Sequence, residues 1–231
     1  IVKDIDYFSA GVTKKIMLTS LDLGVPIYNT SRTILWSPGN KSVAESVIRR
    51  LVREQLEPSF DIMIPPPPSE QERVAELPSI QAQQNQPYNS SDMQGPLDKN
   101  MSGLFNMVIK AAGYGDQEEL VKGIKDEIKP VIKFHKDHFN STRPNELAKV
   151  HGLDFNSDYL ESAQTPSYPS GHAAQAYYMA HKLSEEFPEL GGDFYELANM
   201  VANSRIDAGV HFPSDIDGGK LLAAKLAGKA E

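Results

Sequence analysis

The sequence predicts an all-α protein that is built as a helical bundle. Two observations support this prediction. Apolar residues recur at intervals of three and four along several segments, which is the spacing of one helix face. No segment shows the apolar–polar alternation that is typical of a half-buried strand, and no internal repeat is present. The chain has 231 residues and 40% hydrophobic content, which suits one large domain with an ordinary core.

The first helix is predicted over residues 41–56, where five apolar side chains share one face opposite the charged residues. Residues 57–98 are rich in Pro, Gln, Asn and Ser, and the four prolines at 65–68 favour extended polyproline geometry. We therefore expect loops in this stretch, with one short helix near residues 69–84.

Two further helices are predicted over residues 100–112 and 117–138. Pro130 should kink or divide the second of them, because proline lacks an N–H and its ring crowds the preceding turn. Residues 144–168 are expected to form a long loop.

Helical spacing of apolar residues predicts helices over 173–187 and around 194–202, and a last helix is expected over about 214–228. Arg205 continues the apolar stripe of the second of these helices, so its guanidinium should point into the bundle. A buried cation needs a partner. Taken alone, such an arginine is more often explained by a structural salt bridge than by a bound anion.

Three segments of the C-terminal half gather residues that can hold and process an anion. They are KDHFNSTRP at 136–144, PSGH at 169–172 and SRIDAGVHFPSD at 204–215. Each segment alone is weak evidence, whereas the ordered set is much stronger. A guanidinium can hold two phosphate oxygens at once, and a lysine adds a further charge. The cationic candidates are Lys136, Arg143 and Arg205.

The turn before the predicted helix 173–187 can form an anion cradle from its backbone N–H groups. Gly171 permits close approach of the backbone to a ligand. A simple helix N-cap would explain Ser170 but not the histidine that follows it. His172 would lie beside a bound anion, where it could act as a general acid.

His211 and Asp215 are four residues apart at the start of the last predicted helix, which allows a carboxylate–imidazole contact. Such a contact fixes the imidazole tautomer and leaves one ring nitrogen free to act as a nucleophile. The competing explanation is that Asp215 is an ordinary acid of a first helical turn, a property that Asp217 shares.

The ordered pattern K-x6-R-P, P-S-G-H and S-R-x5-H-x3-D resembles the type 2 phosphatidic acid phosphatase superfamily and its class A non-specific acid phosphatases. The proline run at 65–68 also resembles the start of class A acid phosphatase domains, so the resemblance covers residues 61–228. It implies a helical domain over residues 61–231 of the acid phosphatase/vanadium haloperoxidase type. Residues 1–60 are then an N-terminal extension packed on or near the core, with a role that the sequence leaves open.

The resemblance implies a phosphatase that hydrolyses small phosphomonoesters without a metal or other cofactor. His211 would be the nucleophile that forms a phosphohistidine, His172 the general acid, and Asp215 the partner of the nucleophile. The remaining residues would bind the phosphate, and they are Lys136, Arg143, Ser170, Gly171 and Arg205.

Two alternatives stay open. Vanadium haloperoxidases resemble this superfamily at the same positions and hold vanadate where phosphate would sit, although they are usually much longer chains. A non-catalytic structural or binding protein is the other alternative. No P-loop, H-E-x-x-H motif or Cys/His cluster suggests a different mechanism or a metal site.

Composition limits the partners. A net charge of −8 argues against a nucleic-acid binder, and no apolar run approaches the roughly 20 residues that span a bilayer. The absence of Cys leaves the compartment open. The chain begins at Ile1, as a processed precursor or a trimmed chain would. The family resemblance implies a soluble, periplasmic or secreted protein that assembles as a homo-oligomer.

Overall fold

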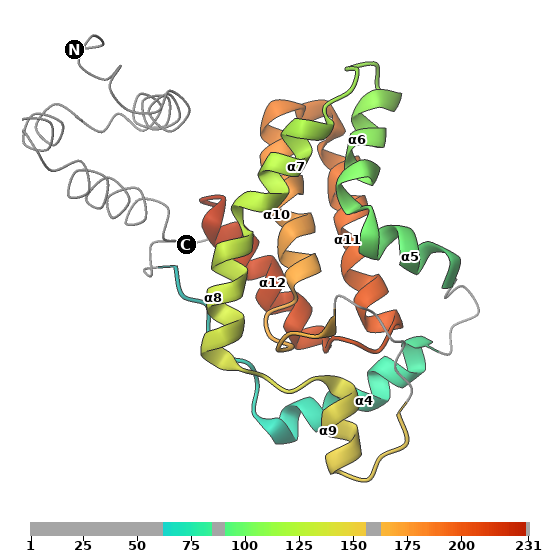
Figure 1. Cartoon of the computed structure of the whole chain (residues 1–231), viewed down its shortest axis with the longest axis vertical. Helices are drawn as coiled ribbons and strands as arrows, with labels where there is room; N and C mark the ends of the chain where they lie inside the picture. Colours follow the sequence, from blue (N-terminus) through green and yellow to red (C-terminus); the bar gives the residue numbers. More distant parts are fainter. Residues whose placement is uncertain (1–61, 85–90, 156–162, 230–231) are drawn as a thin grey trace, which may run out of the picture. The chain divides into compact units, whose positions relative to one another are not determined.

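The structure is a computed structural model that describes residues 62–84, 91–155 and 163–229, and every regular element within these residues is a helix (Figure 1). The all-α prediction is therefore confirmed. The described residues belong to one unit, Ser59–Glu231. The helices are α4 (Glu70–Gln84), α5 (Ser91–Lys99), α6 (Met101–Ala111), α7 (Glu118–Glu127), α8 (Lys129–Phe139), α9 (Pro144–Val150), α10 (Gly171–Glu186), the 3₁₀ helix η3 (Pro188–Leu190), α11 (Gly191–Asp207) and α12 (Pro213–Leu226).

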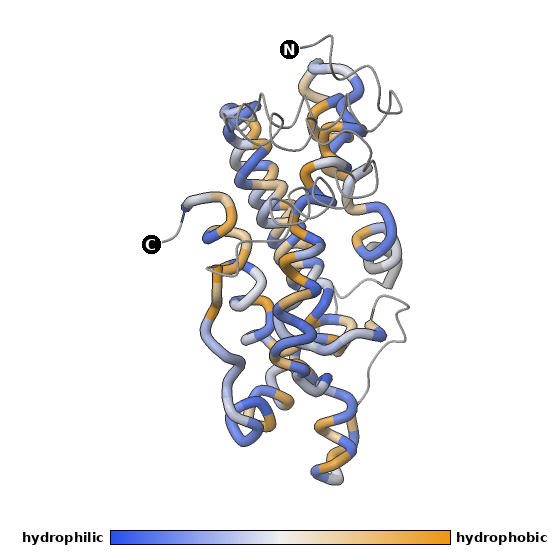
Figure 2. Tube along the Cα trace, turned by 60° about the vertical axis from the view of Figure 1, so that its left-hand side comes forward, coloured by the Kyte–Doolittle hydropathy of each residue, from blue (hydrophilic) through white to orange (hydrophobic). Residues whose placement is uncertain are grey.

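Helix α10 is the centre of the bundle, and it packs chiefly against α11 and α12 and further against α7 and α8 (Figure 1). Its small side chains let the neighbouring helices approach closely, and Ala173, Ala176 and Ala180 are fully buried. The hydropathy of residues changes repeatedly along each helix, as expected for helices with one buried face (Figure 2). The predicted helix over residues 173–187 is confirmed.

The predicted helix over residues 117–138 is divided at Ile128 into α7 and α8, as Pro130 suggested. Pro130 lies in the first turn of α8, where its missing N–H has no intrahelical acceptor to lose. Ile128 itself is fully buried between the two helices. The break therefore costs little, and it redirects α8 toward the loops that carry the sequence motifs.

Two helices occur where loops were expected. Residues 144–150 form α9, which begins with Pro144 and buries Leu147 and Ala148. Proline at the first helical position is compatible with a helix, so the Arg-Pro pair begins a helix here instead of ending one. Residues 91–99 form α5 despite Pro96, and Leu97 is buried from it. In both cases tertiary packing outweighs local composition.

The short helix expected near residues 69–84 is confirmed as α4, which contacts α9, α11 and α12. The helix predicted over residues 41–56 and the extension 1–60 lie outside the described residues. Within the described residues, no helix is both long and apolar enough to cross a membrane.

Candidate active site

The eight residues predicted for the site lie together where the loops after α8 and α11 meet the start of α10. Hydrogen bonds join them in two groups. The first group contains Lys136, Arg143, Ser170, His211 and Asp215. The second group contains His172 and Arg205, which are joined through Asp98 of α5. Gly171 lies against the Lys136 side chain.

Asp215 holds His211 from the first turn of α12. Its Oδ2 accepts a hydrogen bond from His211 Nδ1 at 3.0 Å, and it also accepts from the Phe212 N–H at 3.0 Å and from the Ser167 hydroxyl. Asp215 therefore fills both proposed roles: its Oδ2 caps the start of α12 by accepting from the Phe212 N–H, and the same oxygen accepts from His211. Oδ1 is buried and has no hydrogen-bond partner among the described residues.

Contacts on both sides fix the tautomer of His211. A guanidinium has only donors, and Arg143 Nη1 lies 3.3 Å from His211 Nε2. Nε2 must then be the unprotonated nitrogen, while Nδ1 carries the proton that Asp215 accepts. The lone pair of Nε2 consequently faces the cationic side of the site.

Burial shifts the pKa values of this pair. It raises the pKa of Asp215 to about 6, although Ser167 and the Phe212 N–H oppose the shift. Burial also lowers the pKa of His211 well below its usual value, and the positive charges of Arg143 and Lys136 lower it further. At neutral pH the pair is thus a neutral imidazole beside an ionised carboxylate, which is the state of a nucleophilic histidine.

Arg143 precedes α9 in an extended conformation and is 6% exposed. Its Nε donates to the Thr165 carbonyl at 2.9 Å, and Nη1 donates to the Val210 carbonyl at 2.7 Å. Burial lowers its pKa to about 10, so the side chain stays cationic at neutral pH. These carbonyls hold the guanidinium beside His211.

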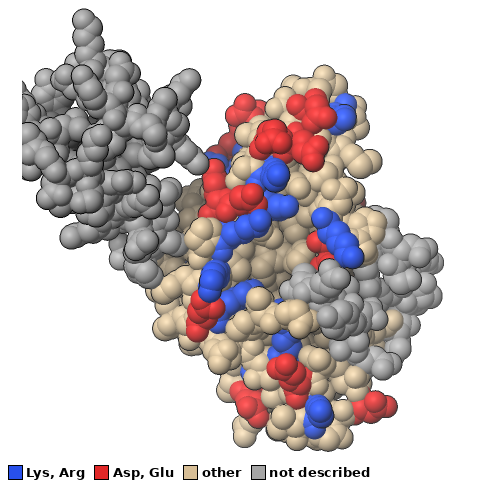
Figure 3. Space-filling view, viewed as in Figure 1, with Lys and Arg blue, Asp and Glu red and all other residues tan. Residues whose placement is uncertain are grey.

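Lys136 is 8% exposed near the end of α8, and its ammonium donates to the main-chain carbonyls of Pro166 and Ser167. Burial, followed by the charge of Arg143, lowers its pKa to about 7. The exposed lysines of α8 differ, because Lys129 and Lys133 pair with Asp126 and Asp137 at the surface. Basic side chains form a stripe on the face of the molecule that Figure 3 shows. Lys136 is therefore a buried lysine of α8, unlike Lys129 and Lys133.

Ser170 begins α10 as its N-cap, with Oγ accepting from the Ala173 N–H at 3.4 Å. Its own N–H donates to the Asp215 carbonyl at 2.9 Å, which ties the turn to α12. A side chain on Gly219 would come within 2.7 Å of the Ser170 carbonyl, so α12 can approach this turn only with a glycine there. At Gly171 an added Cβ would make only ordinary contacts with protein atoms.

Arg205 is 1% exposed on α11, so the predicted direction of its side chain is confirmed. Nη1 donates to Asp98 Oδ1 at 2.6 Å. Burial lowers the pKa of Arg205, and the charge of Asp98 counteracts this. The same Oδ1 lies 3.3 Å from His172 Nε2, and the Asp98 carbonyl lies 3.1 Å from that nitrogen. Burial and the charge of Arg205 lower the pKa of His172 to about 4.

Sequence reasoning missed residues that support the site from outside the motifs. Arg73 of α4 donates to the Ser141 hydroxyl and to the Thr142 carbonyl at 2.9 Å, immediately before Arg143. Glu76 of the same helix accepts from the Ser214 N–H at 3.0 Å, at the start of α12. Helix α4 therefore holds the loop before Arg143 and the start of α12 by hydrogen bonds. No local sequence signal indicates these contacts, because their partners are far apart in the chain.

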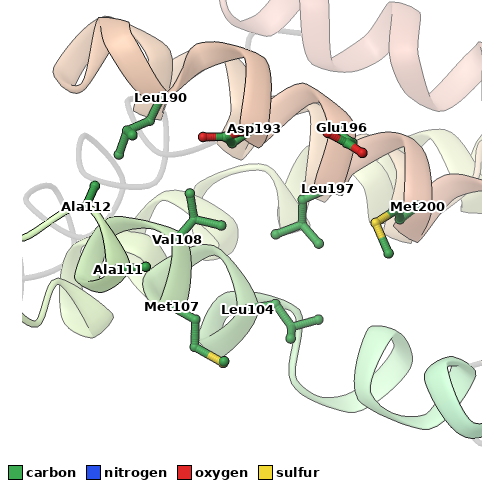
Figure 4. A pocket seen from close by; sticks show the side chains of 10 residues that line it. All are labelled: Leu104, Met107, Val108, Ala111, Ala112, Leu190, Asp193, Glu196, Leu197 and Met200. Atoms are coloured by element: carbon green, nitrogen blue, oxygen red, sulfur yellow. The ribbon is translucent and has the colours of Figure 1, made fainter.

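A separate apolar hollow lies between α6 and α11. Figure 4 shows Leu104, Met107 and Leu197 around it, with Asp193 and Glu196 on the α11 side. None of the predicted site residues lines this hollow. In the part of the chain that the structure describes, no group of three or more His, Asp or Glu side chains is arranged to hold a metal ion.

Residues 128–228 match the family model described as the PAP2 superfamily. A non-specific acid phosphatase of Salmonella typhimurium is 33% identical over 89 residues, which cover 38% of this chain and 35% of that protein. A non-specific acid phosphatase of Providencia stuartii is 27% identical over 135 residues, covering 55% of this chain and 54% of the relative. The chain thus spans about a third to a half of the length of these relatives.

Among solved structures, a transmembrane PAP2-type phosphatidylglycerolphosphate phosphatase from Bacillus subtilis aligns with a TM-score of 0.45 and 20% identity, covering 82% of this chain and 94% of that chain. The family match contains all eight predicted site residues, while α4 and α5 precede it. The resemblance stated from the motifs is confirmed at this level: residues 128–228 match the PAP2 superfamily model, and parts of the chain show modest similarity to non-specific acid phosphatases.

Proposed function

We propose that the chain is a phosphatase that hydrolyses phosphomonoesters through a phosphohistidine on His211, without a metal ion. The observation that supports this most is the position of His211 between Asp215 and Arg143. Nδ1 of the ring donates a hydrogen bond to the Asp215 carboxylate. Nε2 presents a lone pair beside the buried guanidinium of Arg143. A nucleophile that attacks an anionic phosphoryl group needs both features.

In the first step, His211 Nε2 attacks phosphorus and forms a P–N bond. The P–O bond to the leaving group breaks, its electron pair stays on the leaving oxygen, and His172 donates a proton to that oxygen. The Nδ1 proton stays on His211, where the Asp215 carboxylate stabilises the cationic phosphoimidazole.

In the second step, a water molecule attacks phosphorus and gives a proton to His172. The P–N bond breaks, its electron pair returns to Nε2, and inorganic phosphate leaves. Both steps pass through a transition state with negative charge on three phosphoryl oxygens. Lys136, Arg143 and Arg205 supply three buried cationic side chains for this charge, and the N–H groups that open α10 at Gly171 add donors.

The hydrolysis of p-nitrophenyl phosphate tests this proposal, with EDTA and with vanadate as separate additions. We expect turnover to survive EDTA, because the charge compensation comes from side chains. Vanadate should inhibit, since it can take the geometry of the attacked phosphoryl group. Activity that EDTA abolishes and a divalent ion restores would contradict metal independence. Halide oxidation that requires vanadate and exceeds phosphomonoester hydrolysis would identify a haloperoxidase instead.

The pH dependence of kcat/KM follows from two groups with opposite requirements. Catalysis needs Asp215 ionised, with a pKa of about 6, and His172 protonated, with a pKa of about 4. Between these values a rise in pH ionises Asp215 as fast as it deprotonates His172, so the rate is flat. Below about pH 4 the rate falls because Asp215 becomes protonated while His172 is already fully protonated. Above about pH 6 the rate falls because His172 loses its proton while Asp215 is already ionised. We expect a bell centred near pH 5 in steady-state kinetics; a maximum above neutral pH would contradict this assignment of roles.

A further inference from the structure

We propose that Asp98 is a positioning residue of the phosphatase site: its carboxylate anchors Arg205 and gives His172 an acceptor that the leaving-group oxygen replaces during the reaction. This inference rests on the proposed phosphatase function. It concerns a residue of α5 that lies outside the segment matched by the PAP2 family.

Asp98 contacts both Arg205 and His172. Its side chain is only 4% exposed, and one oxygen, Oδ1, lies 2.6 Å from Arg205 Nη1 and 3.3 Å from His172 Nε2. The main-chain carbonyl of Asp98 lies 3.1 Å from the same histidine nitrogen. A single residue therefore meets the cation that would bind phosphate and the imidazole that would protonate the leaving group.

The charges around His172 make this acceptor necessary. Burial, the charge of Arg205 on α11 and the charge of Lys136 on α8 all lower the pKa of His172. The carbonyl and the carboxylate of Asp98 are the interactions that raise it. Asp98 thus favours the protonated imidazole that a general acid requires.

The contact with Nε2 also makes Asp98 a competitor of the substrate. One N–H of an imidazole points in one direction, so the proton on Nε2 can go to Asp98 or to a leaving oxygen, but not to both. A phosphate dianion near Arg205 also meets the negative charge of Asp98. The carboxylate should therefore weaken phosphate binding while it supports proton transfer.

Replacing Asp98 by asparagine separates these effects, because the amide keeps an acceptor for Arg205 and removes the charge. We expect inorganic phosphate to bind several-fold more tightly by titration calorimetry, since a like charge within a few ångströms disfavours an anion. We also expect the maximum of kcat/KM to fall about tenfold and the acid limb of its pH profile to move to lower pH, because His172 loses an interaction that raises its pKa.

The conservative variant Asp98→Glu keeps the charge, and it should keep a pH profile close to that of the unmodified protein. Asp217→Asn on α12 is the matched control, because it removes the same charge from a side chain that is 78% exposed. A purely structural role for Asp98 would weaken phosphate binding and turnover together, without moving the pH profile.

The two proposals can fail separately. An unmodified protein that binds phosphate but hydrolyses no phosphomonoester would overturn the proposed function. The comparison of phosphate binding between this protein and Asp98→Asn could still be made. An Asp98→Asn variant that folds, as judged by circular dichroism, and binds phosphate no more tightly than the unmodified protein would overturn the inference about Asp98. The same conclusion would follow if its pH profile were unchanged.

Discussion

Replacing His211 by alanine is expected to lower phosphomonoester hydrolysis on the order of 10⁴-fold or more, because the variant has no group that can form the phosphohistidine. The fold should survive the change. Asp215 keeps two hydrogen bonds, from the Ser167 hydroxyl and the Phe212 N–H, so its buried carboxylate is not left without donors. Removing the ring leaves the three cations of the site in place.

The measurement is kcat with p-nitrophenyl phosphate, together with circular dichroism and a thermal unfolding curve. His138→Ala is the matched control, since His138 is an exposed histidine on α8 and should leave kcat within about twofold of the unmodified value, as surface substitutions usually do. Trapping the phosphorylated enzyme in alkali and locating the phosphoryl group by mass spectrometry gives an independent check. Turnover that persists in His211→Ala, or a phosphoryl group on another residue, would contradict the proposed mechanism.

The sequence predicts the positions of two side chains of the candidate site better than the elements that support them. The apolar stripe of α11 placed Arg205 inside the bundle, because helical periodicity determines which face a side chain occupies. The interval of four between His211 and Asp215, at the start of the last helix, likewise allows a contact, and the structure shows it at 3.0 Å. Both inferences are local, so a single sequence is sufficient for them.

The partner of Arg205 could not be identified in this way. A salt bridge and a bound anion were competing explanations, and the structure shows the salt bridge, to Asp98. Asp98 lies 107 positions earlier in the chain, at the end of a stretch whose Pro, Gln, Asn and Ser content suggested loops. Composition describes local preference, whereas α5 is stabilised by burial of Leu97 against the rest of the protein. The salt bridge does not remove Arg205 from phosphate binding, because a guanidinium has five N–H donors.

The loop that holds Arg143 shows the same limit. Residues 144–168 were expected to form a long loop, yet Pro144 begins α9. The direction of the Arg143 side chain then depends on the carbonyls of Thr165 and Val210, which belong to loops distant in the sequence. Arg73 of α4 fixes the residues just before it. None of these contacts has a periodic or spaced signature, so only the folded chain reveals them.

Replacing Arg205 by methionine is expected to lower the free energy of unfolding by about 3–5 kcal/mol, which is the usual cost of leaving one partner of a buried ion pair without the other. Arg205 and Asp98 are 1% and 4% exposed, so water cannot solvate the carboxylate that remains. Methionine fills much of the same volume, and the loss should therefore come mainly from removal of the cation that pairs with Asp98.

The double variant Arg205→Met/Asp98→Asn distinguishes a charge effect from a packing effect. If the uncompensated carboxylate causes the loss, removing its charge should restore a large part of the stability in urea unfolding, giving a favourable coupling free energy between the two sites. Lys129→Met is the control, since its pair with Asp126 is about half exposed and should contribute at most about 1 kcal/mol. Strictly additive losses in the double variant would instead mean that Arg205 stabilises the bundle through packing, and that Asp98 is not the group that neutralises it.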